Sequence, residues 1–233
     1  MKVGIMQPYF FPYIGYWQLI NSVDKFVVYD NIQFTKGGWI KRNRILYDGK
    51  DKLFSLSIKK DSDYLDVRDR ILSDKCIEER KKILNNIKIA YKKAPQFENA
   101  FPIIEKCINF ENMNLFEYVY NSIIKIKEYL NISTEIIISS NIQMNHALRN
   151  KYRVMETCKV LGADIYINPI GGIDLYKKDE FSYNGIDLRF MRTNDLKYNQ
   201  FNCEFVPNLS IIDVMMFNSI DEIKKLLGMY ELV

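Results

Sequence analysis

The sequence predicts an α/β fold in which a mostly parallel sheet carries a central helical insert. Residues 2–29 contain an apolar run, a helix-like segment and a second apolar run, which is the order of a β-α-β unit. Between 73 and 130 the apolar residues recur every three or four positions, as they do on one face of a helix. β-branched runs return at 135–138 and 164–167. Strands that alternate with helices are typical of parallel sheets covered by helices.

The first part of the chain predicts two parallel strands followed by a hairpin. The expected strands and the helix between them lie at 2–6, 25–29 and 13–21. Apolar runs at 43–47 and 53–57 flank Asp48-Gly49. Both residues of that pair tolerate the positive φ that a tight hairpin turn requires.

The central segment predicts two or three helices. Ile83, Ile87 and Tyr91 are spaced four residues apart, and helical spacing continues to about residue 130. We expect Pro95 and Pro102 to mark helix starts or breaks, because proline lacks the N–H that a helix interior uses. The resulting division is a first α/β part at 1–72, a helical insert at 73–132 and a second α/β part at 133–233.

The last part predicts helices and strands in alternation. A helix is expected at 147–161 and ends at Gly162, because glycine adopts the left-handed conformation that often closes a helix. Strands are expected at 164–167 and 186–190, and the second suits the edge of the sheet. A helical tail at 210–227 follows. This sequence of elements favours a Rossmann-like sheet.

The composition indicates a globular protein with little affinity for nucleic acid. Hydrophobic residues make up 48% of the 233 positions and charged residues 27%, so the chain can bury a substantial core. The net charge of +4 arises from 33 basic and 29 acidic residues that mingle along the sequence. Without a dense basic block, we expect no DNA partner. The mild positive excess suits an anionic small molecule.

Cysteine usage and hydropathy favour a cytoplasmic protein. The four cysteines stand singly, without the paired spacing of a zinc site, so we expect reduced thiols and no metal centre. The chain opens directly on an apolar strand rather than on a charged leader with a cleavage site. No apolar stretch is long enough to cross a bilayer, so we expect no transmembrane segment.

An aromatic block follows the first expected strand. Residues 7–17 have the sequence QPYFFPYIGYW, in which aromatic rings alternate with two prolines and a glycine. Ligands of parallel sheets lie outside the carboxyl ends of the strands, and the loop after the first strand usually contacts them. We therefore expect the block to form a ligand wall. The candidate substrate-binding residues in it are Gln7, Tyr9, Gly15 and Tyr16. The alternative is a packed connection between strand and helix.

A polar loop at 30–44 follows the second expected strand. It combines a carboxylate, amides and a tryptophan with four cations and the pair Gly37-Gly38. Arginine offers phosphate oxygens a planar fork, and a tryptophan face can cover a base or a sugar. Asp30 is the candidate proton acceptor, and the candidate substrate-binding residues are Gln33, Lys36, Trp39, Arg42, Asn43 and Arg44. The alternative is a solvated basic loop.

Two later strands also end in polar or glycine-containing segments. Because the carboxyl ends of parallel strands meet at one edge, we expect these segments to meet the aromatic block and the Asp30 loop there. The further candidates for substrate contact are Ser139, Ser140, Gly171, Gly172, Tyr176 and Tyr198. No GxGxxG or GxxxxGK[ST] pattern is present. For Asp213 we favour a structural role.

His146 is the single histidine of the chain, which excludes histidine-rich metal sites. It lies near the expected Ser139 edge, and a catalytic base needs only to reach its partner in the folded protein. We therefore retain His146 as a candidate catalytic residue beside Asp30. The alternative is a surface histidine at a helix start.

Several blocks of residues, in order along nearly the whole chain, resemble the WbqC-like family, which is encoded among genes for bacterial surface polysaccharides. The blocks are Gln7-Pro8-Tyr9 with Pro12, Gly15 and Tyr16; Asp24; Asp30 to Gln33 with Lys36, Trp39, Arg42, Asn43 and Arg44; Tyr91 to Pro95; Ser139-Ser140; Tyr166 with Gly171-Gly172 and Tyr176; and Tyr198 with Leu209 to Asp213. The resemblance implies a cytoplasmic role in making O-antigen or a similar glycan.

The first half of the chain is also distantly similar to HIGH-type nucleotide-binding enzymes such as pantothenate synthetase. The similarity lies in a strand, a proline-bearing loop, Gly15 at the start of a helix, and a strand before Gln33-Phe34. Those enzymes place two histidines around the glycine to bind ATP phosphates. Pro12 and Tyr16 stand in their places here, which argues against adenylyl transfer while leaving the fold intact.

The leading hypothesis from the sequence is an N-acyl or aminoacyl transferase acting on a nucleotide-linked amino sugar. Lys36, Arg42 and Arg44 would hold the diphosphate, and Trp39 and Tyr9 would stack on base or sugar. The acyl donor would be acyl-CoA, ATP plus an acid, or charged tRNA. One alternative is a nucleotidyl- or glycosyltransferase that uses the same pocket with a divalent metal. Another is a non-catalytic sugar-nucleotide-binding or scaffold protein; a homodimer is compatible with each.

Overall fold

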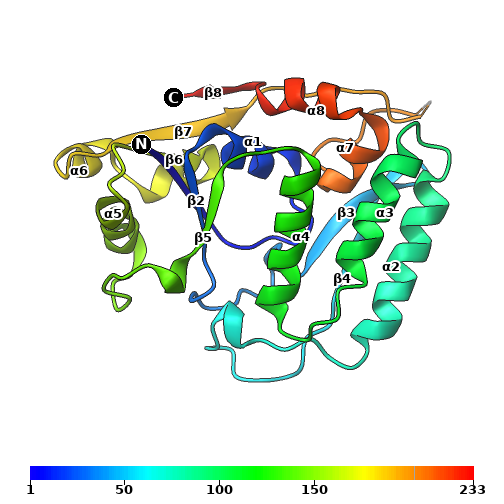
Figure 1. The fold of residues 1–233 in the computed structure, drawn as a ribbon, viewed down its shortest axis with the longest axis horizontal. Coiled ribbons are helices and arrows are strands. Elements are labelled where there is room, and N and C mark those ends of the chain that lie inside the picture. The colour runs from blue at the N-terminus through cyan, green and yellow to red at the C-terminus, as the bar shows by residue number, and fades with distance from the viewer. Residues whose placement is uncertain (202) are drawn as a thin grey trace.

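A computed structural model describes residues 1–201 and 203–233 as a Rossmann-like α/β fold with a six-stranded sheet (Figure 1). The strands are β1 (Lys2–Met6), β2 (Lys25–Val28), β5 (Glu135–Ile138), β6 (Ile165–Pro169), β7 (Asp187–Thr193) and β8 (Tyr230–Leu232). Their spatial order is β5-β2-β1-β6-β7-β8. All neighbouring pairs are parallel except β7 and β8, which are antiparallel. The mostly parallel sheet predicted from the sequence is confirmed.

Helices cover both faces of the sheet, and the strands alternate between two apolar clusters. The helices are α1 (Ile14–Ser22), α2 (Cys76–Tyr91), α3 (Phe97–Ile108), α4 (Leu115–Tyr129), α5 (Asn150–Leu161), α6 (Lys178–Ser182), α7 (Ile211–Phe217) and α8 (Ile220–Leu227). On β2, Phe26 and Val28 face the cluster that contains α1 and α8. Val27 faces the cluster that contains α5 and α6. This is the two-residue period of a sheet buried on both sides.

The central helices pack on one another next to a separate hairpin, which α2 contacts directly. The hairpin pairs β3 (Arg42–Tyr47) with β4 (Lys50–Ser55), and its turn has φ of 52° at Asp48 and 72° at Gly49, as the sequence predicted. Figure 1 shows α2, α3 and α4 side by side next to this hairpin. Phe10 of the aromatic block joins the two, because its ring lies 5.8 Å from that of Phe54 and 5.6 Å from that of Tyr118.

Some element boundaries differ from the sequence prediction. Pro102 lies inside α3 and does not break it. The carbonyl that its missing N–H leaves free belongs to Glu98, which is exposed and can bind water. The strand at 187–193 is interior, because the three-residue strand β8 pairs with it and forms the edge. The helical tail is divided at Ser219, whose side chain forms a capping box with Glu222 at the start of α8.

Two expectations from the sequence concerned membrane-spanning segments and the state of the cysteines. No helix of the described residues is long and apolar enough to span a bilayer. All four cysteines are free thiols, and Cys203 is exposed whereas the other three are buried.

Buried polar side chains hold the loop between β1 and α1. Phe11 has a φ of 47°, which is left-handed backbone that a side chain disfavours, so the loop needs external support. The Asn43 amide donates to the carbonyls of Phe10 and Phe11 at 3.1 and 2.8 Å. The Ser210 hydroxyl donates to the Phe11 carbonyl at 2.8 Å. The loop is therefore fixed from β3 and from the start of α7.

A second buried cluster surrounds Asp213 on α7. Its carboxylate accepts hydrogen bonds from the hydroxyls of Tyr91 and Tyr198, both at 2.7 Å, and from the Gln200 amide at 2.6 Å. The Tyr91 hydroxyl in turn accepts from the backbone N–H of Leu46 at 2.8 Å. The cluster thereby joins α7, α2 and β3. Burial raises the pKa of the Asp213 carboxyl, and the three donors only partly offset that rise.

Replacing Asn43 by alanine is expected to destabilise the protein by about 1–3 kcal/mol, because the Phe10 carbonyl loses its donor and the Phe11 carbonyl keeps only that from Ser210. Urea unfolding followed by circular dichroism measures the change. The matched control is Asn85→Ala on the exposed side of α2, which is expected to stay within about 0.5 kcal/mol of the parent. Equal stabilities of the two variants would contradict the anchoring role.

The raised pKa of Asp213 predicts a specific pH dependence of stability. Above the ordinary pKa of 3.8 the unfolded state releases the Asp213 proton before the folded state does. The unfolding free energy of the parent minus that of Asp213→Asn should therefore fall as pH rises from about 3.8 towards the folded pKa. Urea midpoints of both proteins across a pH series test this. A difference that stays flat or rises with pH would disprove it.

Candidate functional site

Four segments singled out in the sequence leave the sheet at its carboxyl edge. Met6 is in register with Val28, and Val28 with Ile138, so the strands β1, β2 and β5 end level with one another. β6 runs parallel to β1. The segments that begin at Gln7, Tyr29, Ser139 and Ile170 follow these ends. One edge of one sheet therefore presents the aromatic block, the Asp30 loop, the serine pair and the glycine pair, as ligand sites of α/β folds require.

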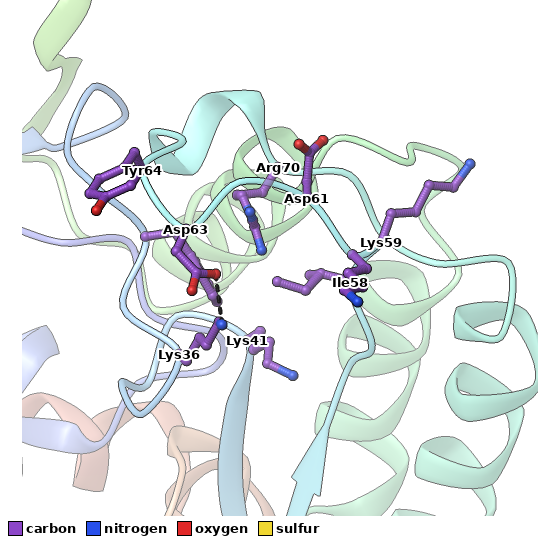
Figure 2. A pocket seen from close by; sticks show the side chains of 10 residues that line it. Lys36, Lys41, Ile58, Lys59, Asp61, Asp63, Tyr64 and Arg70 are labelled. Atoms are coloured by element: carbon purple, nitrogen blue, oxygen red, sulfur yellow. Dashed lines mark ion pairs between the residues drawn. The ribbon is translucent and has the colours of Figure 1, made fainter.

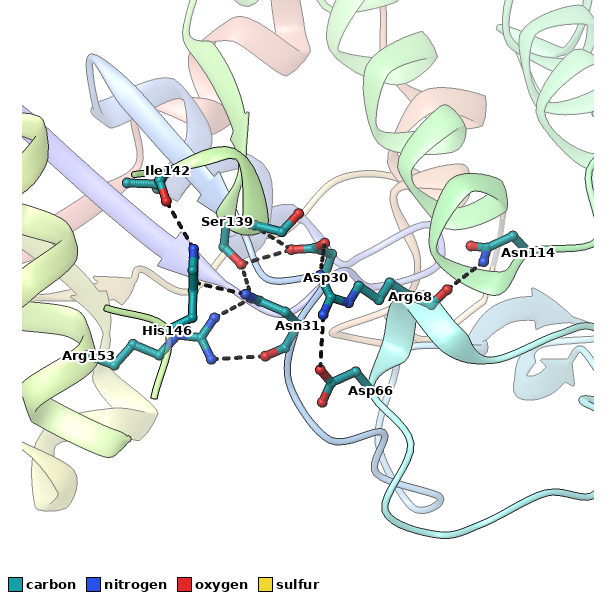
Figure 3. A network of polar contacts seen from close by, with 10 residues as sticks. Asp30, Asn31, Asp66, Arg68, Asn114, Ser139, Ile142, His146 and Arg153 are labelled. Carbon is teal, nitrogen blue, oxygen red and sulfur yellow. Dashed lines mark hydrogen bonds and ion pairs between the residues drawn. The ribbon is translucent and has the colours of Figure 1, made fainter. Parts of the chain in front are cut away.

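Asp30 lies at the centre of a polar network between β2 and β5 (Figure 3). Its Oδ1 accepts from the Ser139 hydroxyl and from the Ser140 backbone N–H, both at 2.9 Å. Its Oδ2 lies 4.0 Å from the Arg68 guanidinium, which is a long contact. The Asp30 side chain is 4% exposed. Oδ1 thus already accepts two hydrogen bonds, whereas Oδ2 can still accept one.

Asn31 connects this network to His146. The Asn31 side-chain oxygen contacts Ser139 and Arg153, so its amide nitrogen must face His146, 3.1 Å from Nδ1. His146 Nε2 lies 3.0 Å from the Ile142 carbonyl. Nδ1 then accepts and Nε2–H donates, which assigns a neutral imidazole protonated on Nε2. Both ring nitrogens are occupied, so His146 holds the loop in this state.

Arg153 on α5 is buried beneath the same loop. Its guanidinium donates to the Asn31 carbonyl at 2.9 Å and lies 4.8 Å from the centre of the Tyr29 ring. Burial lowers its pKa from the usual value. The sequence analysis did not identify Asn31, Arg68 or Arg153 as parts of the site. In the sequence, Arg153 stands next to Val154 and four residues before Thr157, and the structure places all three on the buried side of α5. This helical spacing was the signal that could have identified a buried arginine.

A pocket of about 310 Å³ lies where the aromatic block meets the 30–44 loop. Its lining residues are Tyr9, Pro12, Tyr13, Trp39, Asn43, Arg44 and Asn208. The backbone N–H of Phe10 donates to the carbonyl of Trp39 at 3.2 Å and so joins the two walls. Asn43 borders the pocket, but its amide nitrogen is committed to the loop carbonyls.

Two guanidinium groups lie near the Trp39 ring in this region. The Cζ atoms of Arg42 and Arg44 each lie 5.5 Å from the ring centre. Arg42 also contacts the Gly37 carbonyl, and Arg44 forms an ion pair with Asp51 at 3.1 Å. The Nε atoms of both arginines are buried without a partner among the described residues. Cations stacked on an exposed aromatic ring can bind a phosphorylated, ring-containing molecule.

Several candidate residues from the sequence have other contacts in the structure. Gln7 uses its backbone carbonyl, which accepts from the buried Tyr16 hydroxyl at 3.0 Å. Gly15 provides room for a neighbour, because a Cβ there would lie 2.5 Å from the Tyr13 ring. The Gln33 amide donates to the Asp63 carbonyl at 2.9 Å.

The candidates from the second half of the chain are also separated from the aromatic pocket. A Cβ on Gly172 would lie 2.0 Å from the Asn168 amide, whereas Gly171 borders open space. Tyr176 packs edge-on against Tyr166 at 6.1 Å. Tyr198 belongs to the buried Asp213 cluster. The structural role that the sequence favoured for Asp213 agrees with these contacts.

Lys36 lines a different cavity (Figure 2). It pairs with Asp63 at 2.6 Å. Trp39 and Arg44 are therefore in one pocket and Lys36 in another.

The buried thiols are unsuited to nucleophilic attack. Burial raises the pKa of Cys107 and of Cys158 to about 12 each. Both are therefore protonated at neutral pH, and the thiol is a weak nucleophile compared with the thiolate. Ser139 is the nucleophile-type side chain that lies within the Asp30 network.

Comparison with known proteins identifies the family but no activity. Rv1507c, an uncharacterized protein of Mycobacterium tuberculosis, is 50% identical over 44 residues, a match that spans 19% of each chain. No solved structure matches. The model of the WbqC-like protein family matches residues 7–225, which include the aromatic block, the Asp30 network and the Asp213 cluster. The chain therefore belongs to the WbqC-like protein family.

Proposed function

We propose that this protein is an enzyme of surface-glycan synthesis that forms an amide on the amino group of a nucleotide-linked sugar. The observation that carries the proposal is the pocket in which Tyr9 and Trp39 lie beside Arg44, whose Nε is buried and unpaired among the described residues. Aromatic faces suit a base or a sugar ring, and guanidinium groups suit phosphate oxygens. The resemblance to the WbqC-like family, with its polysaccharide genes, motivates the glycan.

In this proposal the two arginines beside Trp39 hold the diphosphate. Arg42 and Arg44 both approach the Trp39 ring, so phosphates bound to them lie next to a ring stacked there. Lys36, which the sequence analysis grouped with them, lines the other cavity and is left out of this role.

Asp30 is the proposed proton acceptor of the reaction. The sugar amine attacks the acyl carbon, its proton passes to Asp30 Oδ2, and the bond from the acyl carbon to the donor's leaving group breaks with its electron pair. Oδ2 faces Arg68 at 4.0 Å and keeps acceptor capacity, whereas both nitrogens of His146 are occupied.

The reaction is tested by mass spectrometry of nucleotide-linked amino sugars incubated with the purified chain. The donors are acyl-CoA, ATP plus an acid, and charged tRNA. The expected result is a mass gain equal to one acyl group in place of one hydrogen. The matched control is the same sugar nucleotide with its amine already acetylated, which should stay unchanged. No gain with any donor would overturn the proposal.

Trp39→Ala and Arg44→Gln are each expected to raise KM for the sugar nucleotide about 10- to 100-fold, because each removes a stacking or charge-assisted contact. Steady-state kinetics measures the change. The control for Arg44→Gln is Arg189→Gln, which removes an exposed guanidinium paired with Asp187 on β7. A similar KM change in the control would show a general charge effect rather than a pocket.

Asp30→Asn is expected to lower kcat at least about 100-fold with little change in KM, because the amide can still accept from Ser139 and Ser140 but takes up no proton. The comparison variant is His146→Gln, whose amide can accept from Asn31 and donate to Ile142. It should keep kcat within about threefold of the parent, and a loss as large as that of Asp30→Asn would reassign the base to His146.

A further inference from the structure

A second cavity, which the proposed function does not use, lies between the 34–41 loop and the segment that follows β4. Its volume is about 600 Å³, roughly twice that of the aromatic pocket. The lining residues are Phe34, Lys36, Lys41, Ile58, Lys59, Lys60, Asp61, Asp63, Tyr64 and Arg70. Figure 2 shows Lys36, Lys41 and Arg70 around the hollow, with the Lys59 side chain extended away from it.

Positive charge predominates in this cavity. Five lining residues are cationic and two are carboxylates. Asp63 pairs with Lys36 at 2.6 Å, but both side chains are more than 60% exposed, and exposed ion pairs contribute little and open readily. The Asp61 carboxylate accepts from the backbone N–H of Ser62 at 2.7 Å. An anion that entered the cavity would therefore meet an excess of cations.

Arg70 is the most buried of these cations, with 3% of its surface exposed. One terminal nitrogen donates to the Ser62 carbonyl at 2.7 Å, and the guanidinium lies 5.0 Å from the centre of the Phe34 ring. Its Nε is buried without a partner, and no carboxylate of the described chain lies within 4.0 Å. The charge of Arg70 helps to lower the pKa of the nearby Asp63, but Asp63 forms its direct ion pair with Lys36. Burying a cation without a direct ion pair is costly, and an anion in the cavity would offset that cost.

Lys41 is the second partly buried cation at the cavity. Its ammonium donates to the Leu56 carbonyl at 2.9 Å and lies 3.4 Å from the Ser55 hydroxyl. Burial lowers the pKa of Lys41, although the charge of Glu79 acts in the opposite direction. Its hydrogen-bond partners are thus neutral, and no carboxylate of the described residues forms an ion pair with it.

An aromatic side chain lies beside these cations. Tyr64 is 85% exposed, which is high for so large a ring. It lines the cavity together with Arg70 and Lys36. Exposed aromatic rings next to cationic side chains provide a stacking face for a base.

We propose that this cavity binds the pyrophosphate group of a nucleoside diphosphate or triphosphate, with Lys36, Lys41 and Arg70 on the phosphates and the Tyr64 ring against the base. The site is distinct from the aromatic pocket. The two cavities share the 30–44 loop but none of their lining residues, since Lys36 and Lys41 line one cavity while Trp39 and Arg44 line the other. The inference stands independently of the amide-forming reaction.

Isothermal titration of the full chain with ATP and with inorganic pyrophosphate tests the site. Lys36→Gln and Lys41→Gln are each expected to weaken both probes about tenfold, since each removes one charge-assisted contact. The matched control is Lys224→Gln with Lys225→Gln on the exposed side of α8, which should leave both affinities unchanged. Tyr64→Ala should weaken ATP and leave pyrophosphate unchanged.

Three outcomes would overturn the site. They are the absence of binding by both probes at millimolar concentration, equal effects of the cavity variants and the α8 control, and a loss on Trp39→Ala as large as that on Lys36→Gln. Thermal melting of each variant separates loss of binding from loss of folding. Because the titration needs no acyl transfer, its result is independent of whether the amide-forming reaction occurs.

Discussion

The loop after β1 keeps its shape because buried polar side chains satisfy carbonyls that its left-handed turn at Phe11 directs into the protein. Asn43 supplies two of these bonds and Ser210 a third. Both anchors have their own support, since Asn43 lies on β3 and Ser210 caps α7. The Asp213 cluster ties these two elements together through Tyr91 and the Leu46 N–H. The shape of the aromatic pocket therefore depends on these buried hydrogen bonds, and Asn43 takes part in them while also bordering the pocket.

This arrangement makes the 30–44 loop a partition. One end is held at the sheet edge, where Asn31 contacts Arg153 and His146. The other end is β3, held through Asn43. Between these two ends, the side chains of the loop line different cavities. Lys36 and Lys41 line the cationic cavity, and Trp39 lines the aromatic pocket. The two cavities therefore share one short loop as a common wall.

The sequence predicted the parallel sheet, the hairpin turn and the position of four segments at one edge of the sheet, because these follow from local periodicity and from strand direction. The sequence could not show which aromatic residues would be buried in the core and which would line a pocket. Phe10 and Phe11 are fully buried while Tyr9 lines a pocket, yet all three are adjacent aromatics. The sequence also could not identify the hydrogen-bond partner of a polar side chain. Asn43 lies in a polar loop and was predicted to contact the substrate. In the structure its amide donates to the carbonyls of Phe10 and Phe11, far away in the sequence, and so anchors their loop.

The buried arginines show how a structural cation differs from one available to a ligand. Arg80 donates from both terminal nitrogens to backbone carbonyls and lies 4.3 Å from the Tyr118 ring centre. Arg153 likewise uses both terminal nitrogens, on Asn31. Arg70 has a comparable aromatic contact but donates from one terminal nitrogen among the described residues, and it borders a cavity. The Nε atoms of all three arginines are buried without a partner among the described residues, so the contact with the cavity and the second terminal nitrogen are what distinguish Arg70. Because burying a guanidinium is costly, this difference is the basis for the proposed anion site.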